Sequence, residues 1–180
     1  MLVVSSQGGS GDSYTSTGFN VHGPQPNAGN PLGNPAYPGA TSSNGPNYVD
    51  FMSSTYNQSY IQTYSFGYGG ATIDPTLVAS PLGLIVQSFE QQVTESFLPL
   101  YTHGQVPWSA GNTLFTIFFG INDVMLSYLQ QNSSLNYALI KDYERLVNQV
   151  SCPCLVSRSN LVILITALSY MPQVHAILCS

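Results

Sequence analysis

Three short segments of this chain each place a polar side chain on a glycine turn. In the segment GDSYTSTGFN, residues 11–20, Ser13 follows a carboxylate at a point where glycine permits a tight bend. The hydroxyls after it can satisfy the first free N–H groups of a helix, so this segment predicts a strand-to-helix junction. The segments YSFGYGGAT (residues 64–72) and FTIFFGINDV (residues 115–124) each have the pattern of a strand that ends in a glycine turn. If the three strands are parallel neighbours, their turns meet at the carboxyl edge of one sheet, where open α/β sheets bind ligands.

Hydrophobic spacing predicts how these strands alternate with helices. Residues 60–66 and 114–119 have strand patterns, and residues 161–168 are a candidate fourth strand. Residues 84–98 and 134–150 have helical patterns. The first helix is expected to stop at Pro99 and to bury Ile85, Phe89, Val93 and Phe97, and the second is expected to begin at a Ser134 cap. Strands and helices in alternation favour a parallel sheet with right-handed crossovers.

The chain between the first two turns is poor in regular structure. Residues 21–46 contain six prolines, which disfavour both helix and sheet, so we expect a long loop that forms a wall of the binding cleft. A short helix is predicted after Pro46, with Val49, Met52 and Tyr56 on its buried face.

The motifs also resemble a known family. GDSYTSTGFN, NPLGNP, TSSNGPNYVDF, YNQS, YGGAT and GINDV together are similar to the SGNH, or GDSL-type, hydrolase superfamily, and most similar to the secreted fungal acetyl esterases of carbohydrate esterase family 16. The resemblance covers residues 11–150. It implies an α/β, flavodoxin-like three-layer sandwich with a parallel sheet. It also implies Ser13 as nucleophile and Gly70 and Asn122 as oxyanion-hole donors.

The base that such a serine needs is missing from the pattern. The superfamily takes its base and orienting acid from an Asp-x-x-His motif near the C-terminus, whereas His175 is preceded three residues earlier by Pro172. His22 and His103 lie in predicted loops and remain candidates, although neither matches a family position. A serine esterase without its base loses on the order of a millionfold in turnover, so we expect this chain to be impaired or inactive.

Two carboxylates flank the expected functional residues. Asp12 and Asp123 adjoin Ser13 and Asn122, but no histidine pairs with either of them in a motif. We expect each carboxylate to brace its own turn and neither to belong to the catalytic set.

Composition limits the partners. Only 6% of the residues are charged and the net charge is −5, with Lys141, Arg145 and Arg158 as the only basic residues. No basic patch is available to neutralise phosphates, so nucleic acid is not an expected partner. The longest apolar run is too short to span a bilayer. The expected partner is a neutral acetylated carbohydrate or another small ester, and the expected state is a monomer.

The cysteines, two glycosylation patterns and the tryptophan of this chain carry weaker signals. Cys152, Cys154 and Cys179 are an odd number with no accompanying ligand cluster, so no metal or cofactor is expected. Asn57 and Asn132 begin glycosylation acceptor patterns, which agree with secretion but recur by chance. Trp108 is a candidate cleft wall or sugar-stacking platform.

The ends of the chain match the family poorly. Residues 5–10 are small and polar, so a first strand there is doubtful: either its neighbours hold it in place or unrelated sequence replaces the native residues. No export signal is visible at the start, although the family is secreted. We expect one domain over residues 1–180 whose sheet is incomplete at the C-terminal end.

Three functions follow in order of preference. The first is a serine esterase that removes acetyl groups from plant cell-wall carbohydrate, here in a truncated or mis-spliced form. The second is a truncated, non-catalytic extracellular protein that binds carbohydrate or acts at a surface. The third is an α/β domain of no discernible activity, which would require three motif coincidences in order.

Overall fold

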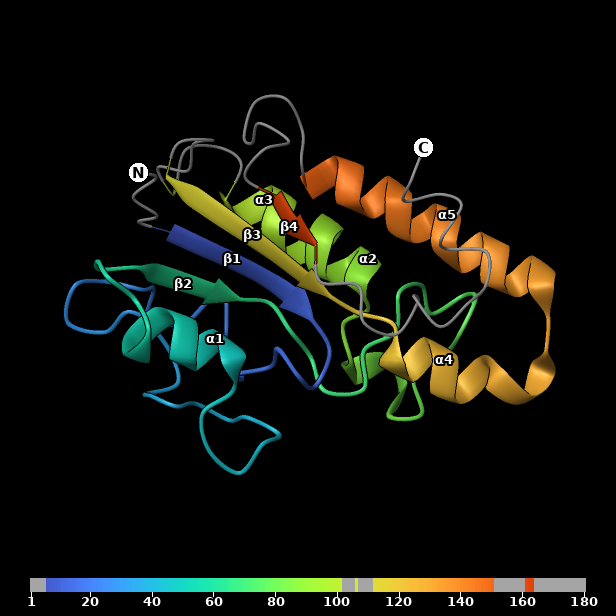
Figure 1. Cartoon of the computed structure of the whole chain (residues 1–180), viewed down its shortest axis with the longest axis horizontal. Helices are drawn as coiled ribbons and strands as arrows, with labels where there is room; N and C mark the ends of the chain where they lie inside the picture. The colour runs from blue at the N-terminus through green and yellow to red at the C-terminus, as the bar shows by residue number, and fades with distance from the viewer. Residues whose placement is uncertain (1–5, 102–105, 107–111, 151–160, 164–180) are drawn as a thin grey trace.

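A parallel sheet forms the centre of the molecule. The computed structural model describes residues 6–101, 106, 112–150 and 161–163 (Figure 1). The strands are β1 (Ser6–Gly11), β2 (Gln62–Ser65), β3 (Thr113–Phe118) and β4 (Leu161–Ile163). Their order is β2-β1-β3-β4 and every neighbouring pair is parallel, which confirms the predicted α/β fold.

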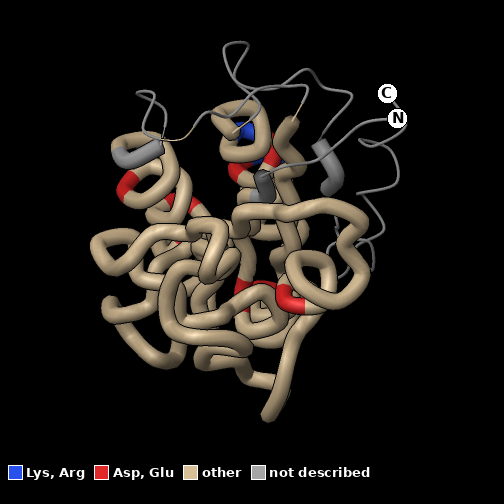
Figure 2. The backbone as a smooth tube through the Cα atoms, turned by 90° about the vertical axis from the view of Figure 1, so that its left-hand side faces the viewer, with Lys and Arg blue, Asp and Glu red and all other residues tan. Residues whose placement is uncertain are grey.

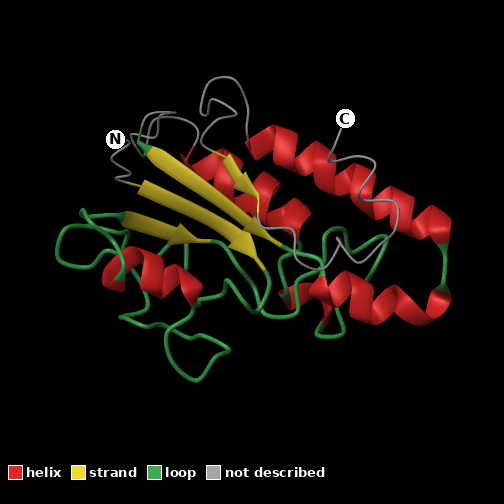
Figure 3. Ribbon diagram, in the orientation of Figure 1, coloured by secondary structure: helices red, strands yellow, loops and turns green. Residues whose placement is uncertain are grey.

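Helices cover both faces of this sheet. They are α1 (Tyr48–Asp50) with the π-helical turn η1 (Phe51–Thr55), η2 (Gly83–Ile85), α2 (Phe89–Gln91), η3 (Gln92–Phe97), α3 (Leu98–Tyr101), α4 (Ile121–Ser127), η4 (Tyr128–Gln130) and α5 (Ser133–Val150). Figure 3 shows α1 on one side of the sheet and α2, α3 and α5 on the other. The result is the three-layer arrangement that the sequence predicts.

Specific contacts fix the two outer layers. On one face, the hydroxyl oxygens of Ser53 in η1 and Thr63 in β2 are 2.7 Å apart. On the other face, the Phe97 ring lies 6.1 Å from the Phe66 ring and 5.5 Å from the Phe115 ring, measured between centroids. Aromatic packing therefore forms much of the core between the sheet and the helices on that face.

The first strand is present and central, so the doubt about residues 5–10 was wrong. Its small residues suit the position because bulky neighbours occupy the space above it. A Cβ atom on Gly8 would lie 2.8 Å from two atoms of the Phe115 ring, and one on Gly11 would lie 2.0 Å from the Thr15 hydroxyl. Composition alone disfavours a strand here, but β2 and β3 hold it on both sides, as the first of the two alternatives expected.

Replacing Gly8 with alanine is expected to lower the free energy of unfolding by roughly 1–3 kcal/mol, since the added methyl group must displace the Phe115 ring. Urea denaturation measures the effect. Gly45→Ala is the matched control, because a Cβ atom there meets nothing within 4 Å. Equal stability of the two variants would contradict this account of the strand.

The helix expected at residues 84–98 starts later and ends later. Ile85 is 82% exposed in η2, and the continuous helical segment begins only after Ser88, whose side chain and that of Gln91 form a capping box. Pro99 does not stop the helix but lies within α3. The π-helical turns of η3 precede it, and the N–H of Leu98 donates to the carbonyl of Val93, five residues back. The regular i→i−4 pattern that a proline breaks is therefore already interrupted where Pro99 enters.

Other boundaries differ in smaller ways. Tyr56 is 76% exposed and does not belong to the buried face of the short helix, although Val49 does. Asn132, not Ser134, caps α5, because its Oδ1 accepts from the N–H groups of Ser134 and Leu135. The predicted buried face of α5 is confirmed over Leu139, Ile140, Tyr143, Leu146, Val147 and Val150.

Candidate active site

Ser13 lies on a single tight turn directly after the central strand. The carbonyl of Asp12 accepts from the N–H groups of Thr15 (3.1 Å) and Ser16 (3.0 Å), and its carboxylate accepts from the N–H of Tyr14 (3.0 Å). Ser13 is half-buried. The predicted helix does not follow, because the turn is not continued and the proline-rich loop begins instead.

The turn that contains Gly70 is tied to the end of β1. The N–H of Tyr68 donates to the carbonyl of Gly11 at 3.0 Å, which draws the segment after β2 against the segment that leads to Ser13. Gly70 has a φ of +79°, a left-handed conformation that favours glycine. A Cβ atom there would also lie 2.9 Å from Leu82. The backbone conformation is the reason for glycine here, since the exposed Leu82 side chain could move aside.

Asn122 joins the third turn to the second. It lies in the first turn of α4, after Gly120 with a φ of +114°, and its Nδ2 donates to the carbonyl of Ala71 at 2.8 Å. Ala71 is the residue after Gly70. Ser13, Gly70 and Asn122 thus lie in the segments that follow three adjacent parallel strands, β1, β2 and β3, at the carboxyl end of the sheet.

An open cleft of about 670 Å³ adjoins Ser13. We name it the Ser13 cleft, and its lining residues are Ser13, Tyr14, Ser42, Ser43, Asn47, Tyr48 and Phe118. The Phe118 ring packs edge-on against Tyr14 at 5.5 Å and Tyr48 at 5.9 Å between centroids. The predicted loop at residues 21–46 contributes two serines to the wall, as expected.

Gln92 is a site-supporting residue that the sequence analysis missed. This side chain is fully buried, and its amide exchanges two hydrogen bonds with Gly11: Oε1 accepts from the N–H at 3.1 Å and Nε2 donates to the carbonyl at 2.9 Å. It therefore fixes the backbone two residues before Ser13. The signal was a glutamine beside Val93 and near Phe89, on the buried side of a predicted amphipathic helix.

Two buried carboxylates lie behind the three turns. Burial raises the pKa of Asp12 to about 6, although the hydrogen bond from the Tyr14 N–H opposes the rise. Burial also raises the pKa of Asp123 to about 7, against the hydrogen bond from the Ile73 N–H and with added repulsion from Asp12 and Asp74. Asp12 braces its own turn as expected, but Asp123 does not: its Oδ1 accepts from Ile73, 3.0 Å away on the Gly70 segment.

The described residues do not bring a histidine into the Ser13 cleft. His22 lines a different cavity and is absent from the Ser13 cleft. His103, His175, Trp108 and the three cysteines lie outside the described residues, so their predicted roles stay predictions. Within the described part of the chain no group of three or more His, Cys, Asp or Glu residues is placed to hold a metal. No helix there is long and apolar enough to cross a membrane.

A parallel sheet with helices on both faces, and with a serine turn after an inner strand, defines an open-sheet α/β protein. The family model of the GDSL-like lipases/acylhydrolases matches residues 10–170, and the chain belongs to this family.

A curated relative narrows the comparison. The chain is 47% identical over 115 residues to an acetylesterase of the fungus Thermothelomyces thermophilus. The aligned segment is 63% of this chain and spans only 38% of the relative's length.

Proposed function

We propose that this protein is a serine ester hydrolase in which Ser13 is the nucleophile. The observation that carries the proposal is the position of Ser13, on a tight turn that opens to a cleft. Gly70 and Asn122 do not line this cleft, but they follow the two strands on either side of β1, at the same end of the sheet as Ser13. In the proposed reaction the Ser13 Oγ adds to the ester carbonyl carbon as its proton passes to a base. The tetrahedral intermediate then expels the alcohol, which takes up a proton, and water hydrolyses the resulting acyl-serine.

The oxyanion donors in this proposal are the N–H groups of Ser13 and Gly70 and the side-chain amide of Asn122. A primary amide carries two N–H donors, and one of them holds Ala71, so the second is left for the oxyanion. Each donor must lie about 3 Å from the position that the oxyanion takes. The hydrogen bond to Ala71 fixes the orientation of the Asn122 amide before substrate binds.

The proposed substrate is an O-acetyl group on plant cell-wall carbohydrate. We propose that the protein acts outside the cell as a monomer, like the esterases of carbohydrate esterase family 16. The acetylesterase relative supports a small acyl group. The few charged side chains of the described residues support a neutral substrate, since Lys141 and Arg145 are paired with Glu144, Asp142 and Glu90 near α5 (Figure 2).

The test measures the reactivity of Ser13 and the hydrolysis of the proposed substrate separately. The purified chain is incubated with a serine-directed phosphonate and, in parallel, with an acetylated xylo-oligosaccharide, and labelling and acetate release are measured. Labelling at Ser13 with acetate release supports the full proposal. Labelling without release supports an activated Ser13 and refutes the proposed substrate. No labelling of a folded sample would refute the site and favour a non-catalytic carbohydrate-binding or surface protein.

Asn122→Ala is expected to slow phosphonate labelling by roughly a hundredfold to a thousandfold, because phosphonylation develops negative charge at the same donors. Labelling rates followed by mass spectrometry measure this. Gln130→Ala, an exposed amide in η4, is the control and should label at the wild-type rate. Equal rates for both variants would remove Asn122 from the oxyanion hole.

A further inference from the structure

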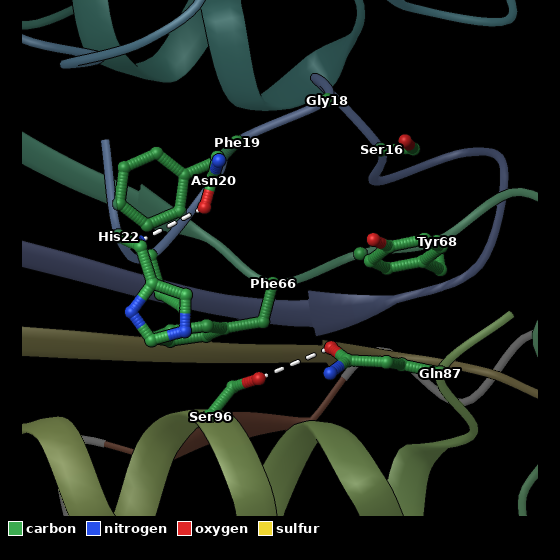
Figure 4. Close-up of a pocket in the computed structure, with 11 residues that line it drawn as sticks. Ser16, Gly18, Phe19, Asn20, His22, Phe66, Tyr68, Gln87 and Ser96 are labelled. Atoms are coloured by element: carbon green, nitrogen blue, oxygen red, sulfur yellow. Dashed lines mark hydrogen bonds between the residues drawn. The ribbon is translucent and has the colours of Figure 1, made fainter. Parts of the chain in front are cut away.

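A second cavity lies away from the Ser13 cleft. It has a volume of about 350 Å³, is partly open to solvent, and lies between the loop after the Ser13 turn, the end of β2 and the η3 helix (Figure 4). We name it the His22 cavity, and its lining residues are Ser16, Gly18, Phe19, Asn20, Val21, His22, Phe66, Gly67, Tyr68, Gln87 and Ser96. It shares no residue with the Ser13 cleft. The two hollows also contact different layers, because Tyr48 of α1 lines one and Ser96 of η3 lines the other.

The polar side chains around the His22 cavity have unused hydrogen-bonding capacity. The Ser96 hydroxyl donates to Oε1 of Gln87 at 3.0 Å, which sets the orientation of that amide (Figure 4). Nε2 of Gln87 has no hydrogen-bond partner among the residues that the structure describes. In the same part of the chain, no protein hydrogen bond is made by the buried Ser16 hydroxyl, or by the Tyr68 hydroxyl and the His22 ring, which are exposed to solvent. These groups include donors, acceptors and groups that can be either.

The rest of the lining is apolar and uncharged. The rings of Phe19 and Phe66 meet edge-on with centroids 6.3 Å apart and form a buried base. None of the lining residues is Asp, Glu, Lys or Arg. An ionic ligand would find no fixed opposite charge here, and a purely apolar ligand would cover the Ser16 hydroxyl and the Gln87 amide without offering them a hydrogen bond.

We propose that the His22 cavity is a second binding site for a neutral, hydroxyl-rich ligand, chemically an unmodified sugar unit. Hydroxyl groups both donate and accept, so they match a mixture of amide, hydroxyl and imidazole groups. The C–H faces of a sugar ring match the phenylalanine base. The volume lies within the range of about 300–1,000 Å³ that is usual for small-molecule sites. The site does not depend on the reactivity of Ser13.

The test is calorimetric titration of the whole chain with xylotriose, which carries no acetyl group and no charge. His22→Ala and Tyr68→Ala are each expected to weaken binding at least tenfold. Tyr128→Ala, which removes an exposed ring from η4, is the matched control and is expected to bind as the wild type does. Circular dichroism of each variant establishes that it is folded. Absence of saturable binding to the wild type, or equal affinity of all three variants, would overturn the proposal.

A second measurement locates the ligand and keeps this proposal apart from the esterase proposal. Amide NMR shifts on adding xylotriose to Ser13→Ala are expected at residues 18–22 and at Gln87. Shifts confined to residues 42–48 would place the sugar in the Ser13 cleft and overturn the second site. Failure of phosphonate labelling would refute the nucleophile but would leave xylotriose binding at the His22 cavity unchanged.

Discussion

Ser13→Ala is expected to abolish phosphonate labelling and to reduce any acetate release to the level of the uncatalysed reaction, because no other residue is proposed to form the acyl intermediate. The structure explains why the phosphonate is expected to react with Ser13 and not with the neighbouring serines. Ser10 and Ser16 are buried and neither lines the Ser13 cleft, whereas Ser13 does. Mass spectrometry of the labelled and digested protein measures the site and the extent of modification.

Ser43→Ala is the matched control for this experiment. Ser43 is an exposed serine on the wall of the same cleft, and its hydroxyl donates to the carbonyl of Gly45 at 2.7 Å. If labelling depended on any hydroxyl in the cleft, both variants would lose it, whereas loss of the nucleophile abolishes labelling only in Ser13→Ala. Full labelling of Ser13→Ala, or a phosphonate mapped to another serine, would show that the family pattern has been assigned to the wrong residue.

The fold could be predicted because its signals are local and repeated. The helical spacing over residues 134–150 and the apolar run over residues 114–119 each match one regular structure, and both were confirmed within one residue at each end. The strand at residues 6–11 could not be predicted in this way. Its stability comes from two neighbouring strands and from an aromatic ring that needs the space above Gly8, and all of these lie far away in sequence.

Element ends were harder to predict than element types. Proline is a reliable sequence signal for a helix end, yet Pro99 lies inside α3 because π-helical turns precede it. Apolar spacing includes Ile85 in the helix, but the capping box at Ser88 determines where the helix starts. The Ser88-x-x-Gln91 spacing is itself a sequence signal for a helix start, and the apolar spacing was given more weight than this signal. The π-helical turns have no comparable local signal.

In the candidate site, too, the residues with a local sequence signal were predicted and those held by long-range contacts were not. Motif residues on the three turns were found because each follows a strand, whereas their supports were not found. Gln92 reaches Gly11 across 81 residues, and Asp123 reaches Ile73 across 50. Long-range hydrogen bonds such as these depend on how whole helices and strands pack, so no local sequence pattern predicts them.

Raising the pH from 4 to 8 is expected to lower the free energy of unfolding more in the wild type than in Asp123→Asn. Burial raises the pKa of Asp123 from 3.8 to about 7 in the folded protein. Between these two values the folded state holds a proton that the unfolded state has lost, so stability falls as the pH rises. The contribution of one such carboxyl is on the order of 3–4 kcal/mol over this window, at about 1.4 kcal/mol per unit. Asp12 adds to the same trend, since its pKa is also raised by burial.

Asparagine is the informative replacement because it separates charge from hydrogen bonding. Its side-chain oxygen can still accept from the Ile73 N–H, and it stays neutral at every pH of the experiment. Alanine would instead leave that N–H unpaired, at a cost of about 1–3 kcal/mol that does not vary with pH. Urea unfolding of wild type, Asp123→Asn and the exposed control Glu144→Gln at pH 4, 6 and 8 measures the difference. Parallel loss of stability in wild type and Asp123→Asn would mean that Asp123 is ionised in the fold, with its charge compensated by a group that the described contacts do not include.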